Sequence, residues 1–253
     1  MRLTTVGLFV LVSATFGAPT QLPKFPQNWG VHEDQYAHIQ FQKVEWHGHV
    51  YNDFTVAPHD GCQDPISPGA RNCSAVAYVD DSGQKSTYDF YENEKSIRGL
   101  TYFVTPEQTC YCDMAILGRW LQSEIAESLT NPFMLKSGTL EKSGAVYKDK
   151  KVDVVRWTES LIFATSKMRI YVDEGGTSPV QYYTTFAEGN TSLGFNEVNM
   201  TDFTPGRPDP SVFIVPGKNM GTCPDYKCQS YSKKLKKGMH PIAAFPWHGN
   251  EKE

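Results

Sequence analysis

The sequence predicts a mainly β protein, an antiparallel meander with one or two helices. Short runs of aromatic and β-branched residues recur between turn residues, which is the pattern of an all-β chain. One segment of helical period interrupts these runs, and a proline-rich segment with apolar side chains follows the last of them. Sequential hairpins give an antiparallel sheet, and its helix is expected to lie on the apolar face.

The first group of strands precedes residue 113. The strands predicted here lie at residues 36–46, 73–79, 86–91, 100–104 and 109–112. The second and third of these form a hairpin, because the connection Asp80-Asp81-Ser82-Gly83 supplies the positive φ that a tight turn needs.

One segment, residues 113–129, has the spacing of an amphipathic helix. Its apolar residues recur three and four positions apart and form a single stripe: Ile116, Leu117, Trp120, Leu121, Ile125 and Leu129. Asp113 can cap its start, and Asn131-Pro132 ends it. We interpret the stripe as core packing against the sheet, with a partner-binding face as the alternative.

The second group of strands follows the helix. The strands predicted here lie at residues 133–139, 151–157, 168–172, 180–186 and 192–198, with a tight connection at 173–179. No repeat period is visible along the chain.

The closing segment, residues 202–223, is predicted to be ordered although it cannot form a regular ladder. Pro205, Pro208 and Pro210 each remove a backbone donor and fix φ. The apolar run 211–215 follows, and a segment this apolar has side chains to bury. It contains no catalytic group.

The two ends of the chain differ from the predicted domain. Residues 1–17 have the features of a secretory signal, with Arg2, a short apolar stretch and a cleavage site after Gly17. A membrane anchor needs about 20 apolar residues, and prolines interrupt this stretch sooner. Cleavage leaves 236 of the 253 residues, which fits one β domain at 18–228, with two small domains as the alternative. Residues 229–253 are predicted to be a disordered basic tail, with contact to anionic lipid head groups as the alternative.

Six cysteines behind a secretory signal predict three disulfides. They are Cys62, Cys73, Cys110, Cys112, Cys223 and Cys228. Cys110 and Cys112 are expected to reach two different partners, because on a strand they face the same side with their Cα atoms near the upper limit for a bridge. A bridge from either to Cys223 or Cys228 would tie the closing segment back across half the chain. The connectivity stays open.

Three N-glycosylation acceptor sequons begin at Asn72, Asn190 and Asn199. Because a predicted secretory signal precedes all three, we expect at least one of them to carry glycan. Asn72 is the weakest of them, because the next residue is a candidate bridge cysteine.

The sequence contains few groups that point to a specific chemistry. A net charge of −4, or −5 without Arg2, provides no overall attraction for nucleic acid. No nucleophile elbow, phosphate loop or metalloprotease motif is present. His47 and His49 share a strand face and form a weak metal candidate without a fixed third ligand. The acidic pairs Glu33-Asp34, Asp80-Asp81 and Asp173-Glu174 offer oxygen to calcium, but acidic pairs in turns usually stay solvated.

Part of the chain resembles the meander of LolA-type lipoprotein carriers. The residues concerned are Val152-Asp153-Val154-Val155-Arg156-Trp157, Arg169-Ile170-Tyr171-Val172-Asp173 and Pro179-Val180-Gln181-Tyr182. The ending resembles secreted eukaryotic relatives of that fold, the ependymin-related proteins and the amino-terminal domain of counting-factor-associated papain-like proteins. Its residues are Phe203-Thr204-Pro205-Gly206, Asp209-Pro210-Ser211-Val212-Phe213, Pro216 and Cys223.

This resemblance covers residues 130–223 and implies a curved antiparallel half-barrel with a helix on its concave face. An apolar cleft between the two would hold acyl chains or other hydrophobic ligands. Ependymin relatives are regarded as calcium-responsive, so calcium is implied by resemblance only. No papain-like segment follows, so peptidase activity is not implied. The candidate cleft residues are Trp120, Phe133, Trp157, Phe163, Tyr171, Tyr183 and Phe186, with ordinary core packing as the alternative.

The expected function is therefore that of a secreted, non-enzymatic glycoprotein that binds or carries a hydrophobic ligand. The alternative is an extracellular interaction protein that contacts matrix or cells and whose cleft is only core. A hydrolase is not expected, because no nucleophile constellation is visible.

Overall fold

The structure of the chain is a computed structural model. It describes residues 26, 28–39, 42–62, 72–91, 99–113, 139–160, 165–173, 178–217 and 220–228. Its elements are β1 (Trp29–Ile39), β2 (Gln42–Pro58), η1 (Asp60–Cys62), β3 (Asn72–Asp80), β4 (Ser86–Tyr91), β5 (Gly99–Val104), β6 (Thr109–Asp113), β7 (Thr139–Tyr147), β8 (Lys150–Ser160), β9 (Thr165–Asp173), β10 (Pro179–Glu188), β11 (Thr191–Pro205), η3 (Pro210–Phe213) and β12 (Gly221–Thr222). The predicted signal, the predicted helix after Asp113 and the predicted tail lie outside the described residues.

The strands form one sheet in the order β12-β6-β5-β4-β3-β2-β1-β11-β10-β9-β8-β7. Two meanders, β1 to β6 and β7 to β11, meet where β1 pairs with β11. Strand neighbours are antiparallel except for β12, which runs parallel to β6. The prediction of a mainly β chain built on an antiparallel meander is confirmed.

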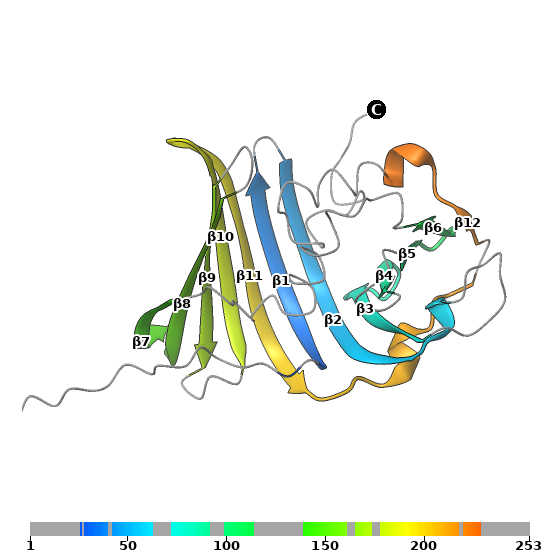
Figure 1. Cartoon of the computed structure of the whole chain (residues 1–253), viewed down its shortest axis with the longest axis horizontal. Helices are drawn as coiled ribbons and strands as arrows, with labels where there is room; N and C mark the ends of the chain where they lie inside the picture. Colours follow the sequence, from blue (N-terminus) through cyan, green and yellow to red (C-terminus); the bar gives the residue numbers. More distant parts are fainter. Residues whose placement is uncertain are drawn as a thin grey trace, which may run out of the picture.

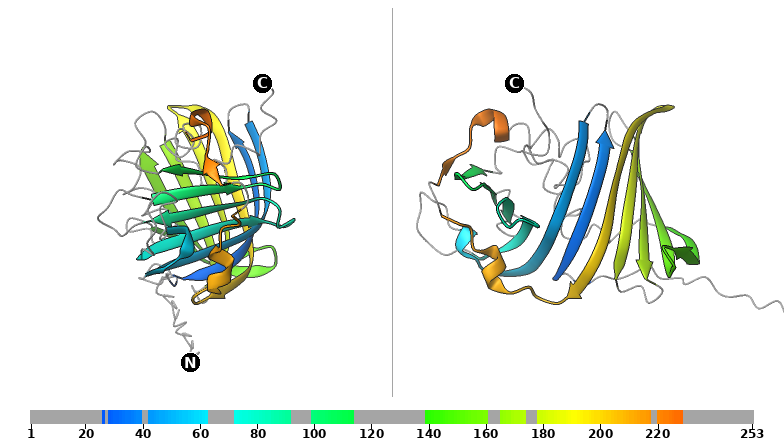
Figure 2. Two further views of the ribbon diagram at one scale, coloured as in Figure 1. Left: turned by 90° about the vertical axis from the view of Figure 1, so that its right-hand side faces the viewer. Right: turned by 180° about the vertical axis from the view of Figure 1, so that it is seen from behind.

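The sheet is strongly curved (Figure 1). Strand β2 is 17 residues long, and its register with β3 shifts between Asp53 and Ala57. A bulge of this kind bends a strand and increases its twist. As a result β3 to β6 turn away from the wall formed by β1 and β7 to β11, and the two groups of strands cross at a large angle (Figure 2).

The two faces of the sheet follow from the period of two along each strand. In β1, Val31, Glu33 and Gln35 are buried on the inner face of the curve, whereas His32 and Asp34 lie on the outer face. The inner face carries one apolar cluster that extends from β9 across the sheet to β6. It includes Trp29, Val31, Trp46, Val50, Val76, Tyr78, Phe103, Ile170, Val172, Tyr182, Val198 and Met200.

Two strand predictions need correction. Residues 36–46 were predicted as one strand region, but β1 ends at Ile39 and β2 begins at Gln42, so the region contains two paired strands. The alternation continues through this connection without a glycine or proline, so the sequence shows no break. Strand β7 was missed because its turn into β8 uses Lys148 and Asp149 at positive φ (45° and 63°), positions that Asn-Gly usually fills.

The hairpin predicted around residues 80–83 is confirmed as β3 and β4. Gly83 has a φ of 65°, and the Oδ1 atom of Asp80 accepts hydrogen bonds from Ser82 Oγ and from the backbone N–H groups of Gln84 and Lys85. The turn is therefore held by its own side chains.

The closing segment is ordered, as predicted, and crosses the outer side of β3 to β6 (Figure 2). Phe213 of η3 is buried in a second apolar cluster with side chains of β3 to β5, among them Tyr88, Phe90 and Tyr102. Thr109 Oγ1 donates a hydrogen bond to the carbonyl oxygen of Pro216 over 2.6 Å. The closing segment therefore covers the outer face of the sheet in this half of the molecule.

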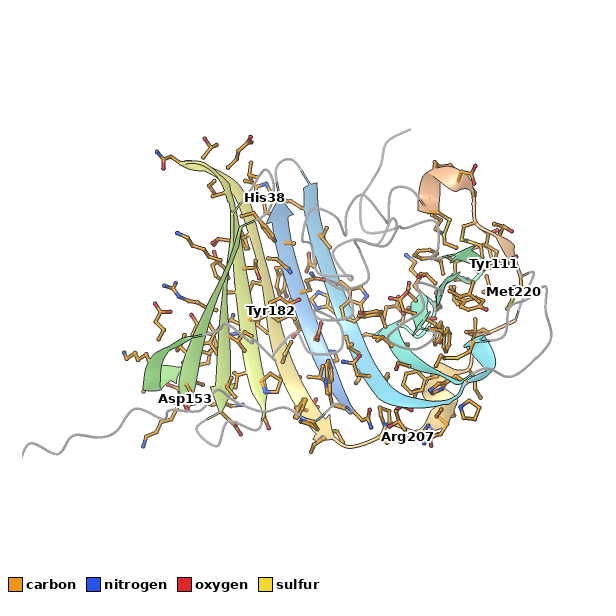
Figure 3. All side chains as sticks on the ribbon, viewed as in Figure 1. His38, Tyr111, Asp153, Tyr182, Arg207 and Met220 are labelled. Carbon is orange, nitrogen blue, oxygen red and sulfur yellow. A yellow bond between two sulfur atoms is a disulfide. The ribbon has the colours of Figure 1, made fainter. Side chains whose placement is uncertain are left out.

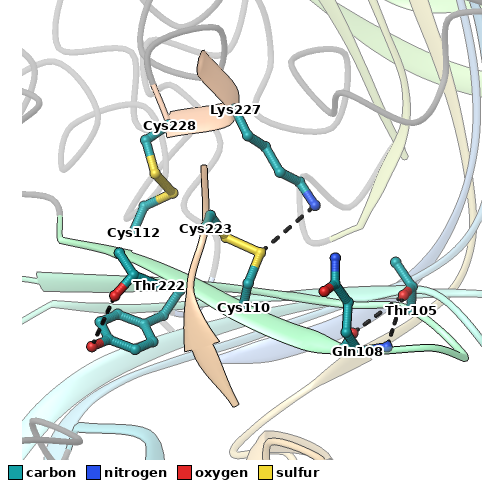
Figure 4. Close-up of a disulfide and its surroundings, with 9 residues drawn as sticks. Thr105, Gln108, Cys110, Cys112, Thr222, Cys223, Lys227 and Cys228 are labelled. Carbon is teal, nitrogen blue, oxygen red and sulfur yellow. Dashed lines mark hydrogen bonds between the residues drawn. A yellow bond between two sulfur atoms is a disulfide. The ribbon is translucent and has the colours of Figure 1, made fainter. Parts of the chain in front are cut away.

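Disulfides anchor the end of this segment (Figure 4). Cys223 bonds to Cys110 and Cys228 bonds to Cys112, with Cα–Cα distances of 4.8 and 5.7 Å, while Cys62 bonds to Cys73. The prediction that Cys110 and Cys112 reach different partners is confirmed. Beside them Lys227 Nζ lies 4.9 Å from the ring centre of Phe103, and burial lowers the pKa of this amine.

The start of the closing segment is held by a buried carboxylate. Arg207 Nε donates to Asp53 Oδ2 over 2.7 Å, and His59 Nε2 lies 3.5 Å from the same oxygen. The Asp53 side chain is fully buried, whereas that of Arg207 is 44% exposed. Figure 3 labels Arg207 beside the bend of β2.

We expect Arg207→Met to lower the free energy of unfolding by about 2 kcal/mol, because it leaves a buried carboxylate without its closest cation. Arg169→Met is the matched control, since Arg169 pairs over 2.8 Å with Glu141 on the exposed outer face and such pairs contribute about 1 kcal/mol or less. Urea unfolding of both variants measures the difference. Equal losses would contradict a specific role for the Arg207–Asp53 pair.

Candidate functional site

The inner face of the curved sheet combines an apolar surface with a small polar centre. Glu33 and Gln35 of β1 and Asn196 of β11 lie among the apolar side chains and are each at most 1% exposed. Gln35 Nε2 donates to Asn196 Oδ1 over 2.9 Å. Glu33 Oε2 and Gln35 Oε1 accept no hydrogen bond in the described structure. A buried polar atom without a partner costs about 1 to 3 kcal/mol. Among the described residues Asn52 Oδ1 and Thr87 Oγ1 are in the same state, but Glu33 and Gln35 place two such oxygens next to each other on one face of β1.

Burial raises the pKa of Glu33 from 4.5 to about 8. At neutral pH this carboxyl group is therefore mainly protonated, and it offers one O–H donor beside a free acceptor. Burial raises the pKa values of Tyr78 and Tyr182 well above the usual 10. The charge of Asp89 and then that of Glu33 raise the pKa of Tyr78 further, and the charge of Glu33 raises that of Tyr182. The centre of the inner face is thus neutral around pH 7 and has unused hydrogen-bonding capacity.

The predicted cleft residues do not gather on one face. Phe186 is 4% exposed, and its place in the alternation of β10 puts it on the inner face with Tyr182 (labelled in Figure 3). Tyr171 and Tyr183 lie on the outer face, where Tyr171 packs on Tyr147 with ring centres 4.7 Å apart and Tyr183 stacks on Phe195. Trp120, Phe133, Phe163 and the side chain of Trp157 lie outside the described residues.

Glu33, Gln35 and Tyr182 were not predicted as site residues. The sequence does contain a pattern that indicates them. In a strand, alternate residues lie on one face, so Glu33 and Gln35 share a face with the apolar residues Val31 and Ala37. The strand predicted at residues 36–46 begins after Val31, Glu33 and Gln35, so the prediction did not include them.

The outer face holds a surface groove of about 390 Å³ between the closing segment and β1 and β2. Its walls include Gly30, His49 and Tyr51 from the strands and Thr204, Arg207 and Asp209 from the closing segment. A side chain at position 30 would meet the Tyr51 ring, with an added Cβ 3.1 Å from its Cδ1 atom. Glycine there leaves room for this ring in the groove.

His47 and His49 both lie on the outer face, as their spacing predicts, but they belong to separate networks. His47 Nδ1 lies 2.7 Å from Asp34 Oδ1 and its Nε2 lies 3.2 Å from Glu45 Oε1. The pKa of His47 is raised, first by the hydrogen bond with Asp34 and further by Glu45. His49 instead faces His32, with ring centres 4.9 Å apart.

The acidic pairs considered for calcium have their oxygens directed elsewhere. Glu33 lies on the inner face and Asp34 on the outer face, so they cannot bind one ion together. Asp80 holds its own turn, and Asp173 Oδ1 accepts from the N–H of Ser178. Glu174 lies outside the described residues.

The sequons differ in accessibility. Asn190 is exposed in the turn between β10 and β11. Asn199 lies within β11, where its side chain hydrogen-bonds with Lys148 and Glu197. Asn72 opens β3 directly before the bridged Cys73.

Comparison with known proteins gives similarity in fold only. The chain matches no protein-family model and no curated protein sequence. Several solved structures are similar. A DUF1329 family protein from Desulfovibrio piger has 7% identity and a TM-score of 0.36, over 75% of this chain and 90% of that one. A LolA superfamily protein from Nitrosomonas europaea has 9% identity and a TM-score of 0.32, over 76% and 92%.

A domain named as an outer membrane lipoprotein-sorting protein, from Vibrio parahaemolyticus, has 6% identity and a TM-score of 0.31, over 73% of this chain and 88% of that one. Similarity this distant says nothing about ligand or activity, and the relation to ependymin-related proteins stays a prediction.

Two further observations concern the compartment. All six cysteines are paired, which fits an extracellular or periplasmic environment, where disulfides persist. Within the part of the chain that the structure describes, no helix has the length and apolar character needed to span a bilayer.

Proposed function

We propose that this chain is a secreted, non-enzymatic protein that binds a hydrophobic molecule, such as a lipid acyl chain, on the inner face of its curved sheet. The observation that supports this most directly is the pair of unpartnered buried oxygens, Glu33 Oε2 and Gln35 Oε1, at the centre of a wide apolar surface. Ligand sites for small molecules are mostly apolar, with a few polar groups that orient the ligand.

This arrangement favours a ligand with an apolar body and one neutral or acidic polar end. Protonated Glu33 can donate to a carbonyl or carboxyl oxygen, while Gln35 Oε1 can accept from a hydroxyl. Each new hydrogen bond would remove the cost of a buried unpartnered atom. The apolar body would lie along side chains such as Ile170, Val198 and Met200.

Three further features support the rest of the proposal. Residues 1–17 resemble a secretory signal, and the six paired cysteines leave no thiol nucleophile. Asn190 is the acceptor we propose for glycan, because it is exposed in a turn.

Native mass spectrometry and lipid extraction of the full chain, purified from the medium of a eukaryotic host, test this function. We expect a bound apolar molecule, and displacement of a fluorescent fatty-acid probe after delipidation. Repeated recovery of empty protein that binds no probe would overturn the proposal.

The polar centre is tested with matched variants and matched ligands. Glu33→Met should weaken binding of a fatty acid about tenfold, a loss of about 1.4 kcal/mol, and should leave a hydrocarbon of equal length unaffected. Asp34→Asn changes the adjacent carboxylate on the opposite face and should alter neither. Equal effects of both variants would contradict the assignment of the ligand to the inner face.

A further inference from the structure

Three potential metal ligands from distant parts of the sequence converge on the outer face. They are His32 of β1, His49 of β2 and Asp81 in the turn after β3, and their ligand atoms all lie within 4.8 Å of one another. His32 Nε2 lies 3.0 Å from Asp81 Oδ1, and His49 Nδ1 lies 4.0 Å from the same oxygen. The side chains of His32, His49 and Asp81 are 19%, 46% and 52% exposed, so an ion from solution can reach them.

The backbone holds the three residues in place. His32 and His49 are direct cross-strand partners in the β1–β2 ladder, and such partners have Cβ atoms about 5 Å apart. The N–H of Asp81 donates to the carbonyl oxygen of His47 over 3.1 Å, which fixes the turn against β2. The side chain of Asp80 orders the rest of that turn.

Gly48 allows the turn to come this close. A Cβ atom at this position would lie 2.9 Å from Asp80 Cα and 2.6 Å from the Trp46 ring. Any other residue would push β2 away from the end of β3, and His49 and Asp81 would separate. The close approach of these strands is therefore a precondition of the cluster.

The donor set is that of a transition-metal ion. Two imidazole nitrogens and one carboxylate oxygen suit zinc or copper(II), whereas calcium and magnesium prefer oxygen alone. Ligand atoms of a tetrahedral zinc site are about 3.3 Å apart, given bonds of about 2.0 to 2.1 Å. The two distances to Asp81 Oδ1, 3.0 and 4.0 Å, bracket this spacing, and every pair of ligand atoms lies within 4.8 Å, so side-chain rotations can bring the three atoms to it.

The surroundings support coordination. The hydroxyl group of Thr201 lies 3.5 Å from His32 Nδ1, so it can accept from this nitrogen and leave the Nε2 lone pair for a metal. His49 also lines the outer groove, which gives solvent or a small ligand access to the open coordination positions. The other group of potential ligands in the described residues, Cys112, Cys223 and Cys228, is used in disulfides.

We propose that His32, His49 and Asp81 form a binding site for one divalent transition-metal ion of the zinc or copper type. The site lies on the face opposite to the proposed ligand surface, and it does not depend on the proposed function. His47 does not belong to it, because Asp34 and Glu45 occupy both of its nitrogens.

Isothermal titration calorimetry of the full chain with zinc ions tests the site, and visible absorption after titration with cobalt(II) reports the coordination geometry. We expect one ion per chain and a cobalt spectrum of tetrahedral or five-coordinate type. His49→Gln and Asp81→Asn should each weaken zinc binding about tenfold or more and should abolish the cobalt signal. Both residues are exposed, and circular dichroism will verify that the variants fold.

Two control variants locate the site. His38→Gln changes an exposed histidine on the same face of β1 as His32. A second variant replaces His240 and His248 near the chain end. Neither variant should alter the affinity for zinc. The proposal is overturned if zinc does not bind, if binding survives both His49→Gln and Asp81→Asn, or if it depends on His240 and His248.

Discussion

A variant without the two bridges that anchor the closing segment should lose about 7 kcal/mol of unfolding free energy, more than the sum of about 4 to 6 kcal/mol that two single removals give. The bridges close loops with sequence separations of 113 and 116, and one loop of that length contributes about 4.8 kcal/mol in the chain-entropy account. When one bridge remains, the unfolded chain is already closed at nearly the same point. Each single removal should therefore cost only about 2 to 3 kcal/mol.

Chemical denaturation of three variants measures this coupling: Cys110→Ala with Cys223→Ala, Cys112→Ala with Cys228→Ala, and all four changes together. Removal of the Cys62–Cys73 bridge, with a sequence separation of 11, is the control and should cost about 2.8 kcal/mol whether or not the other bridges are present. Purely additive losses for the two anchoring bridges would contradict the explanation.

The physical reason for this dependence is the weak pairing at the end of the closing segment. Strand β12 has two residues, and its register on β6 consists of Gly221 with Cys110 and Thr222 with Tyr111. So short a parallel pair adds little stability by itself. The disulfides therefore hold β12 at the edge of the sheet.

The second large effect is a loss of stability as the pH rises. The folded chain keeps the proton of Glu33 up to a pH of about 8, whereas the unfolded chain releases it near the ordinary pKa of 4.5. The folded state thus binds more protons in this range, so its stability decreases by about 1.4 kcal/mol per pH unit. The stabilisation that the raised pKa of Glu33 gives the folded state is complete below pH 4.5 and is lost as the pH rises through about 8.

Glu33→Gln should remove most of this slope and should be more stable than the natural chain at about pH 8, because the amide does not ionise. Thermal unfolding between about pH 5 and pH 8 measures the pH dependence of stability in both chains, and Glu188→Gln, at an exposed position, is the control. His47, whose pKa is raised, contributes a smaller slope of the same sign that should persist in the variant. An unchanged slope in Glu33→Gln would show that Glu33 is not the titrating group.

Local signals in the sequence explain which parts of the fold were predictable. The turn at 80–83 has glycine at the position of positive φ, and the hairpin around it was predicted correctly. The β7–β8 turn places Lys148 and Asp149 at positive φ. Lys-Asp is not the usual residue pair of such a turn, so the sequence gives no indication that a turn lies there. The prediction that prolines exclude a ladder from residues 202–223 was wrong at both ends, because Thr204 and Pro205 pair with β1 within β11, and Gly221 and Thr222 pair with β6. The apolar residues of the closing segment correctly predicted burial, which Phe213 shows at 1% exposure.

The candidate sites were less predictable, because they depend on which face each strand presents and on which strands are neighbours. Tyr171 and Tyr183 seemed equivalent to Phe186 as aromatic strand residues, but their parity places them on the outer face. The sequence pairs His49 with its neighbour His47, whereas the spatial partners of His49 are 17 residues before it and 32 after it, at His32 and Asp81.

By itself the sequence determined the β class, the order of the hairpins, the number of disulfides and an ordered closing segment. Each of these follows from interactions within a few residues or from composition, such as the period of two, the turn residues and an even number of cysteines. Only the tertiary structure decided that β1 lies between β2 and β11, that Cys223 meets Cys110, and that Glu33 Oε2 is buried without a hydrogen-bond partner. These are contacts between residues far apart in the chain, and they arise when the curved sheet brings its strands together.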